Sequence, residues 1–266
     1  MEAIVEQLES GETMVDGSGE ELSEQEFTQL GLALVQHGDQ VQSLDLHETG
    51  LTDFEAQILA QTFSQMPSLH DLSLCWNHLT PPGLLVLASS FTSNLKDLYL
   101  AGNLQLGDLA VEHLKSSGLL GQLEVLDLGE CGLGLEGTII LANHLSTSRL
   151  RELSLGLNVD IGDDGLRSLC NVLDKSKLES LDVTGCGVTD AGVIPLAIAM
   201  NACPCLREIR LNDNDITDGG ALLLGQALKQ STVVTVLDLE GNPQVSEEML
   251  QEMYKYLNRD RSQAKE

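Results

Sequence analysis

The sequence predicts an α/β solenoid, in which one parallel sheet of about eight strands is covered by helices on its outer side. Three observations support this prediction. A short apolar strand pattern recurs eight times, with starts 26 to 28 residues apart. An apolar run at helical spacing follows each strand, and a turn with a capping residue separates the two. One such unit cannot bury its own apolar face, so neighbouring units must stack.

The clearest copy of the pattern lies at residues 206–216, where Leu206, Ile209 and Leu211 precede Asn214 and Ile216. It reads L-x-x-[LI]-x-L-x-x-N-x-[LI]. Consecutive parallel strands require a crossover, which the helix of each unit supplies, and we expect that crossover to be right-handed. The eight units start at residues 41, 69, 95, 123, 150, 178, 206 and 234.

Four segments are expected along the chain. Residues 1–21 are acidic and rich in Gly, which predicts a flexible N-terminal segment. Residues 22–40 contain Ser23 and Glu26 at the spacing of a capping box and predict an N-terminal capping half repeat. Residues 41–257 form the repeat domain, and its last helix is expected to act as a C-terminal cap. Residues 258–266 are expected to be a C-terminal tail.

The turn before most helices contains Ser, Thr or an acidic residue, as at Thr52-Asp53, Thr189-Asp190 and Thr217-Asp218. These side chains satisfy free N–H groups at the start of a helix, and their negative charge suits the helix dipole. Part of the acidic composition therefore has a structural explanation.

The ninth position of the pattern holds mostly Asn or Cys. The residues there are Thr49, Asn77, Asn103, Cys131, Asn158, Cys186, Asn214 and Asn242. Together with the period and the full helix, this resembles the ribonuclease-inhibitor-like class of leucine-rich repeats. Members of that class include ribonuclease inhibitor, the Ran GTPase-activating protein, the tropomodulin C-terminal domain and the repeat arms of NOD-like receptors.

The resemblance covers residues 41 to 257, and it implies a horseshoe with the sheet on the concave face and helices on the convex face. It also implies a ladder of buried Asn side chains that bond the backbone of the turns, in which Cys can replace Asn. The class mostly serves protein recognition, so the resemblance implies a binding function.

The formal charge of −27, from 41 acidic and 14 basic residues, argues against partners with phosphate backbones or anionic surfaces. We therefore expect a basic protein partner, no binding to nucleic acid or membranes, and a monomer. The first residues lack the basic region and apolar core of a secretory signal. Six Cys residues without a disulfide-like spacing favour a cytoplasmic, reducing location.

Several short motifs suggest chemistry, but their positions in the repeats explain them better. Residues 132–137 match G-x-G-x-x-G, yet Leu133 is the core position of the fourth unit. Residues 212–219 resemble a calcium loop, but the spacing fails at the sixth and twelfth positions. The six His residues show no metal-binding or catalytic spacing. The sequence therefore predicts no enzyme activity, no catalytic residues, no cofactor and no metal.

The third, fifth, seventh and eighth positions of each unit are expected to point into the concave face. Twelve side chains at these positions are carboxylates, and Arg210 is the one Arg or Lys among them. Aromatic side chains on an exposed face are typical interface anchors. The candidate partner-binding residues are Trp76, Tyr99, Asp45, His47, Glu48, Asp71, Ser73, Asp97, Asp127, Glu152, Asp182, Glu208, Arg210 and Asp238.

Two alternatives stay open for Trp76 and for the carboxylates. The indole can fold over the neighbouring turn and merely shield the sheet edge, and the acidic residues can form a solvated face without a partner. For the whole chain, the sequence favours a non-enzymatic scaffold that binds a protein across its concave face. The alternatives are a regulator of a small GTPase resembling the Ran GTPase-activating protein, or a rigid subunit of a larger cytoskeletal or innate-sensing complex.

Overall fold

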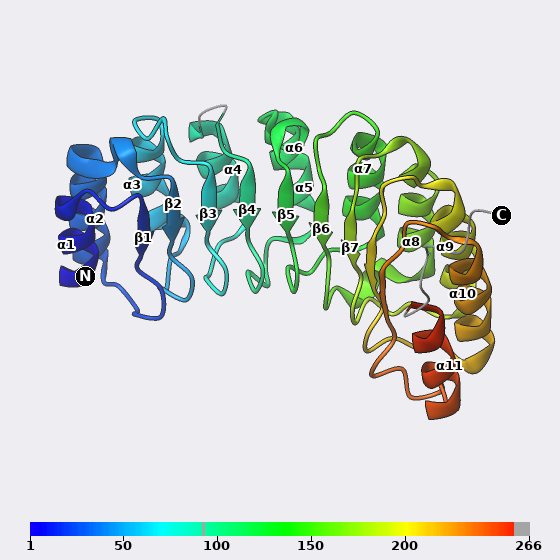
Figure 1. Cartoon of the computed structure of the whole chain (residues 1–266). Coiled ribbons are helices and arrows are strands. Elements are labelled where there is room, and N and C mark those ends of the chain that lie inside the picture. The colour runs from blue at the N-terminus through cyan, green and yellow to red at the C-terminus, as the bar shows by residue number, and fades with distance from the viewer. Residues whose placement is uncertain (92–93, 258–266) are drawn as a thin grey trace. The chain divides into compact units, whose positions relative to one another are not determined.

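The computed structural model describes residues 1–91 and 94–257, and the chain divides into two compact units, Met1–Gly132 and Leu133–Glu266 (Figure 1). In each unit short parallel strands alternate with helices, which confirms the predicted fold class of stacked α/β repeats. The predicted tail at residues 258–266 lies outside the described residues.

The first unit contains a parallel sheet in the order β1-β2-β3-β4-β5. The register aligns equivalent repeat positions, so that Leu44, Leu72, Leu98 and Leu126 lie side by side across four strands. Its elements are α1 (Glu2–Ser10), β1 (Met14–Asp16), α2 (Glu24–His37), η1 (Gly38–Gln40), β2 (Ser43–Asp45), α3 (Asp53–Phe63), β3 (Asp71–Ser73), α4 (Pro81–Ser90), β4 (Asp97–Tyr99), α5 (Gly107–Ser116), α6 (Leu119–Gln122) and β5 (Val125–Asp127).

The second unit repeats this arrangement with parallel strands in the order β6-β7-β8-β9. Leu153, Leu181, Ile209 and Leu237 form its aligned central row. Its elements are α7 (Leu135–Leu145), β6 (Glu152–Ser154), η2 (Val159–Ile161), α8 (Gly162–Cys170), η3 (Leu173–Lys175), β7 (Ser180–Asp182), α9 (Asp190–Ala202), β8 (Glu208–Arg210), α10 (Asp218–Gln230), β9 (Val236–Asp238) and α11 (Glu247–Leu257).

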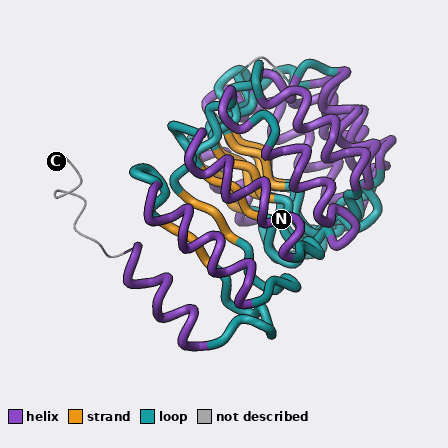
Figure 2. The backbone as a smooth tube through the Cα atoms, turned by 90° about the vertical axis from the view of Figure 1, so that its right-hand side faces the viewer, coloured by secondary structure: helices purple, strands orange, loops and turns teal. Residues whose placement is uncertain are grey.

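In both units the helices cover one face of the sheet and leave the other face open (Figures 1 and 2). The middle residue of each strand is buried beneath the helices, while its two neighbours are partly or fully exposed. This alternation follows from the two-residue period of a strand. We call the exposed side of the strands, together with the turn that follows each strand, the open face.

Residues 1–21, for which the sequence predicts a flexible segment, contain helix α1 and strand β1. Strand β1 pairs in parallel with β2, with Val15 opposite Leu44. Helix α1 lies against β1. The side-chain amide of Gln7 donates to the carbonyl of Asp16 at 2.9 Å and accepts from its N–H at 2.8 Å. Residues 22–40 therefore follow a strand of their own and complete a full repeat, which α1 covers.

The sequence pattern missed β1 because two of the three positions that are apolar in the other repeats hold other residues here. Glu12 stands at the first position, and Gly17 stands where other repeats have Leu or Val. Ile4 of α1 fills the space of that missing side chain, since a Cβ on Gly17 would lie 2.7 Å from Cδ1 of Ile4. The apolar residue that completes this layer therefore comes from a helix outside the repeat.

The ninth-position side chains form the expected buried ladder between repeats. Asn214 Oδ1 accepts from the N–H groups of Cys186 and Val188 at 3.0 and 2.9 Å. Its Nδ2 donates to the carbonyls of Val183 and Leu211 at 2.9 and 3.0 Å. One side chain thus satisfies backbone groups of two repeats, where water cannot reach them.

Cysteine replaces asparagine in this ladder, as the resemblance implied. The Cys131 thiol donates to the carbonyl of Leu100 at 3.3 Å, and the Cys186 thiol donates to the carbonyl of Leu155 at 3.1 Å. Both side chains are buried, and burial raises the pKa of the Cys186 thiol to about 12. The thiol therefore stays protonated and acts as a hydrogen-bond donor.

A second ladder joins the starts of successive helices. Asp163, in the first turn of α8, accepts from the N–H and the hydroxyl of Thr189 at 2.7 Å each. Asp190, in the first turn of α9, accepts from the same two groups of Thr217 at 2.8 and 2.6 Å. Asp53 bonds Thr80 in this way in the first unit. These aspartates therefore stabilise the next repeat as well as their own helix.

We expect Asn214→Ala to lower the free energy of unfolding by about 1–3 kcal/mol, because the buried N–H and carbonyl groups that it bonds lose their partner. Urea denaturation followed by circular dichroism measures this change. Asn201→Ala, which removes an exposed asparagine from α9, is the control and should change stability by less than about 0.5 kcal/mol. Equal stability of the two variants would contradict the role of the ladder.

Two glycines of α10 should respond oppositely to substitution by Ala. A Cβ on Gly220 would lie 2.3 Å from Oδ1 of Asp190, so Gly220→Ala should disrupt the second ladder and destabilise the protein. A Cβ on Gly225 would have its nearest neighbour at 3.7 Å, so Gly225→Ala should stabilise α10 by up to about 1 kcal/mol. Thermal unfolding of both variants tests this, and a stabilising Gly220→Ala would argue against the ladder.

Candidate functional site

The register of the first unit arranges the predicted binding residues in rows across the open face. Asp45, Ser73, Tyr99 and Asp127 are paired with one another along β2 to β5. Ser43, Asp71, Asp97 and Val125 form a parallel row two residues earlier. Adjacent strands lie about 4.8 Å apart, so these side chains are close neighbours.

The eighth position, in the turn after each strand, has a left-handed backbone in every repeat from the first to the eighth. Three of these residues are Gly, and five are not: Glu48, Trp76, Glu130, Leu157 and Asp213. A left-handed conformation costs a residue other than Gly about 1 kcal/mol or more. Glycine at the third, sixth and eighth units signals this conformation in the sequence, but only the backbone angles establish it for the others.

Trp76 lies in this turn and packs one side of its ring on the next repeat. A Cβ on Gly102 would lie 2.6 Å from Cδ2 of the indole, so only glycine permits this approach. The indole nevertheless stays 52% exposed. Contact with the neighbouring turn therefore holds the ring in place and leaves much of its surface to solvent.

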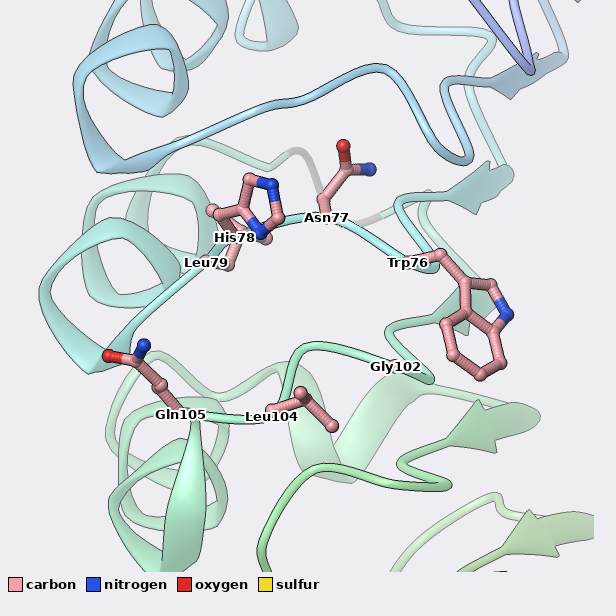
Figure 3. A pocket seen from close by; sticks show the side chains of 7 residues that line it. All are labelled: Trp76, Asn77, His78, Leu79, Gly102, Leu104 and Gln105. Atoms are coloured by element: carbon pink, nitrogen blue, oxygen red, sulfur yellow. The ribbon is translucent and has the colours of Figure 1, made fainter. Parts of the chain in front are cut away.

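Beside Trp76 lies a pocket of about 210 Å³ between the turns of the second and third repeats (Figure 3). The sequence prediction missed its other exposed members, of which Leu104 is 63% exposed. The available signal was an apolar residue directly after the ladder position, where neighbouring repeats have Gly50, His78 and Gly132. The lining residues are Trp76, Asn77, His78, Leu79, Gly102, Leu104 and Gln105.

Four of the predicted carboxylates have a structural role that the sequence did not reveal. Asp45 accepts from the N–H of His47 at 2.9 Å, and Asp127 accepts from Gly129 at 2.9 Å. In the second unit, Asp182 and Asp238 accept from the residues two positions on at 2.9 and 3.1 Å. Each bond closes a local turn at the end of a strand.

Other carboxylates of the first unit lie close to one another or to a histidine. Ser43 donates to Asp71 at 3.2 Å, and Asp71 is paired with Asp97. Burial, followed by the charges of Asp71 and Glu124, raises the pKa of Asp97 above its usual value. Glu48 lies 3.5 Å from His47 Nε2.

Cys75 lies in the same region and is partly exposed. Burial and the charge of Asp127 raise the pKa of its thiol to about 11. Because the thiolate is the reactive form, this environment makes Cys75 a poor nucleophile at neutral pH.

In the second unit the predicted residues are distributed over β6 to β9. Arg210 forms an ion pair with Glu208 of its own strand, and its register partner on β7 is Asp182. Glu152 lies on β6, at the third position of its repeat, and Asp238 lies on β9, at the fifth position of its repeat. The one cation of the predicted set is therefore already engaged by a carboxylate.

Across residues 1–91 and 94–257, no group of three or more His, Cys, Asp or Glu side chains converges as metal ligands would. No helix within these ranges has the length and apolar character needed to cross a membrane.

Asp97→Asn should raise the free energy of unfolding at neutral pH. The folded protein disfavours the charged form of Asp97, as its raised pKa indicates, so removing the charge relieves a penalty. The gain should shrink as the pH falls through the pKa of the folded state. It should vanish below roughly pH 4, where the unfolded chain also binds the proton. Denaturant titrations across pH test this, with exposed Asp39→Asn as the control; a gain that persists at low pH would contradict the assignment.

Comparison with known proteins shows which proteins this chain is similar to. Residues 65–88, 149–170, 174–197 and 202–225 match the family described as Leucine Rich repeat. Ribonuclease inhibitor of Sus scrofa is 36% identical over 197 residues, which cover 71% of this chain and 42% of that protein. The mouse ribonuclease inhibitor is 31% identical over 216 residues, covering 80% of this chain and 41% of that protein. The chain thus spans about two fifths of the length of these relatives.

A chain in the solved structure of the Rad7 and Elc1 complex in yeast has a TM-score of 0.60, with 18% identity over 87% of this chain and 64% of that chain. At that identity the likeness shows the fold alone. The repeat period, the Asn and Cys ladder and the matches to ribonuclease inhibitors agree, and together they support the ribonuclease-inhibitor-like leucine-rich repeat family.

Proposed function

We propose that this chain is a protein-binding scaffold that recognises a basic partner on its open face. The observation that carries the proposal is Trp76, a large aromatic side chain that is fixed by Gly102 and yet 52% exposed. Tyr99 lies on β4, one strand beyond the strand that precedes Trp76. Asp71 and Asp97 form the row of side chains two residues before the row of Ser73 and Tyr99. Aromatic anchors surrounded by polar groups are where binding energy concentrates in protein interfaces.

The proposed binding residues of the first unit are those around this anchor. We propose Asp45 and Asp127 as binding residues even though each also accepts a backbone hydrogen bond, because a carboxylate has further acceptor capacity. The full proposed set is Asp45, His47, Glu48, Asp71, Ser73, Trp76, Asp97, Tyr99 and Asp127 in the first unit, and Glu152, Asp182, Glu208, Arg210 and Asp238 in the second.

Family membership supports a binding role. Ribonuclease inhibitor is, by its name, a protein that acts on another protein, and related repeats occur in NACHT, LRR and PYD domains-containing proteins. We propose that this chain uses the same kind of surface. Because it spans two fifths of the inhibitors, the choice of partner is taken from the charge of its own open face, not from theirs.

The proposed setting is the cytoplasm, where the six free cysteines would stay reduced. The charge of −27 opposes self-association and binding to nucleic acid, so we propose a monomer whose partner is a protein.

Affinity capture with quantitative mass spectrometry, followed by binding measurements on the purified partner, tests the proposal. Trp76→Ala should weaken binding by about 2 kcal/mol or more. Reversing the charge at Asp71 and Asp97 should mainly slow association and reduce its salt dependence. Ile198→Ala, which alters an exposed apolar residue on α9, is the matched control and should bind normally.

Full affinity of a folded Trp76→Ala, Tyr99→Ala double variant would place the site elsewhere. Stimulated GTP hydrolysis by a small GTPase on addition of this protein would favour the alternative of a GTPase regulator.

A further inference from the structure

The pocket beside Trp76 has the size and lining for one side chain. Its volume of about 210 Å³ is below the roughly 300–1,000 Å³ of small-molecule pockets. The turn of the second repeat supplies one wall with Trp76 and His78, and the turn of the third repeat supplies the other with Leu104 and Gln105 (Figure 3). Trp76 and Leu104 keep large apolar areas exposed at its rim.

Two carboxylates flank this pocket along the row of eighth positions. Glu48 N–H donates to the carbonyl of Cys75 at 2.9 Å, which sets Glu48 one strand before Trp76. Gly102 N–H donates to the carbonyl of Gly129 at 2.9 Å, which sets Glu130 one strand beyond Gly102. The row therefore reads Glu48, Trp76, Gly102, Glu130, with an apolar centre and a negative charge on each side.

The spacing of this row fits an extended peptide that crosses the strands. Three strand spacings of about 4.8 Å separate Glu48 from Glu130, or about 14 Å at the backbone. An extended chain advances about 3.4 Å per residue, so four residues span the same distance. A residue midway between the two ends would then lie over Trp76 and Gly102.

We propose that this pocket binds an extended partner segment of the form basic-x-apolar-x-basic. The apolar side chain enters between Trp76 and Leu104, and the two basic side chains pair with Glu48 and Glu130. This inference rests on the proposed function and adds to it a specific partner motif and a position at the turns. A second copy of this chain is disfavoured as the occupant because of its net charge of −27.

The test uses Trp76 as its own probe, since it is the one tryptophan of the chain. The peptide acetyl-Arg-Ser-Leu-Ser-Arg-amide is titrated while the indole emission is recorded. We expect a saturable blue shift with a Kd of about 1 mM or tighter. Replacing the central Leu by Ser, or both Arg by Glu, should weaken binding at least about tenfold.

Variants of the protein separate the pocket from the rest of the open face. Leu104→Asp should reduce peptide affinity at least about tenfold, whereas Leu109→Asp, an exposed leucine on α5 outside the pocket, should leave it unchanged. Glu48→Gln with Glu130→Gln should weaken binding and reduce its salt dependence, whereas Glu112→Gln on α5 should do neither.

The inference would be overturned if the indole emission shows no saturable shift at peptide concentrations well above about 1 mM. It would also be overturned if Leu104→Asp binds the peptide with full affinity. If charge reversal at Asp71 and Asp97 abolishes binding while Leu104→Asp does not, the open-face function survives and the pocket assignment fails. If sedimentation shows a dimer that Leu104→Asp dissociates, the occupant is a second copy and the partner motif is wrong.

Discussion

The buried ninth-position side chain is the interaction on which the repeat structure depends. Each strand is only three residues long, so the sheet alone leaves the following turn with unpaired backbone groups. Asn214 bonds backbone groups of two successive repeats, and Asn77 bonds both the Leu46 carbonyl and the Leu51 N–H of the repeat before it. Cysteine can do part of this work because the thiol donates one hydrogen bond. The turns of the open face are therefore fixed by groups that lie beneath them.

The acidic composition of the chain divides between structure and surface. Asp163 and Asp190 connect the starts of successive helices, and Asp45 and Asp182 close turns at strand ends. The structural roles of these carboxylates do not depend on a binding partner. Asp97 differs, because burial beside other carboxylates raises its pKa and makes its charge unfavourable for folding. A residue whose charge opposes folding is a stronger candidate for binding than one whose charge stabilises a turn.

The binding surface proposed here depends on the left-handed turns. At Trp76 this conformation directs a large ring over Gly102, where the absence of a Cβ allows close packing. In the second unit Leu157 lies over Gly185 in the same manner, with 2.8 Å between its Cδ2 and a Cβ built on the glycine. A rigid side chain that is partly exposed loses little conformational entropy when a partner covers it. The left-handed turn thus holds the ring in place while much of the ring surface stays available to a partner.

The sequence alone determined the repeat unit, its period and the side of each strand that faces solvent, because these follow from local periodicity. The Asn and Cys ladder was implied by the resemblance to a known class of repeats. The sequence placed Trp76 and Tyr99 on the exposed side but not the pocket, which joins Trp76 to Leu104 of the next repeat. It also missed strand β1, because Ile4 from α1 replaces the apolar residue that Gly17 lacks. The tertiary structure decided these features and the hydrogen bonds of Asp45 and Asp163. Each depends on which side chain of a neighbouring element fills a space, and no period along the chain encodes that contact.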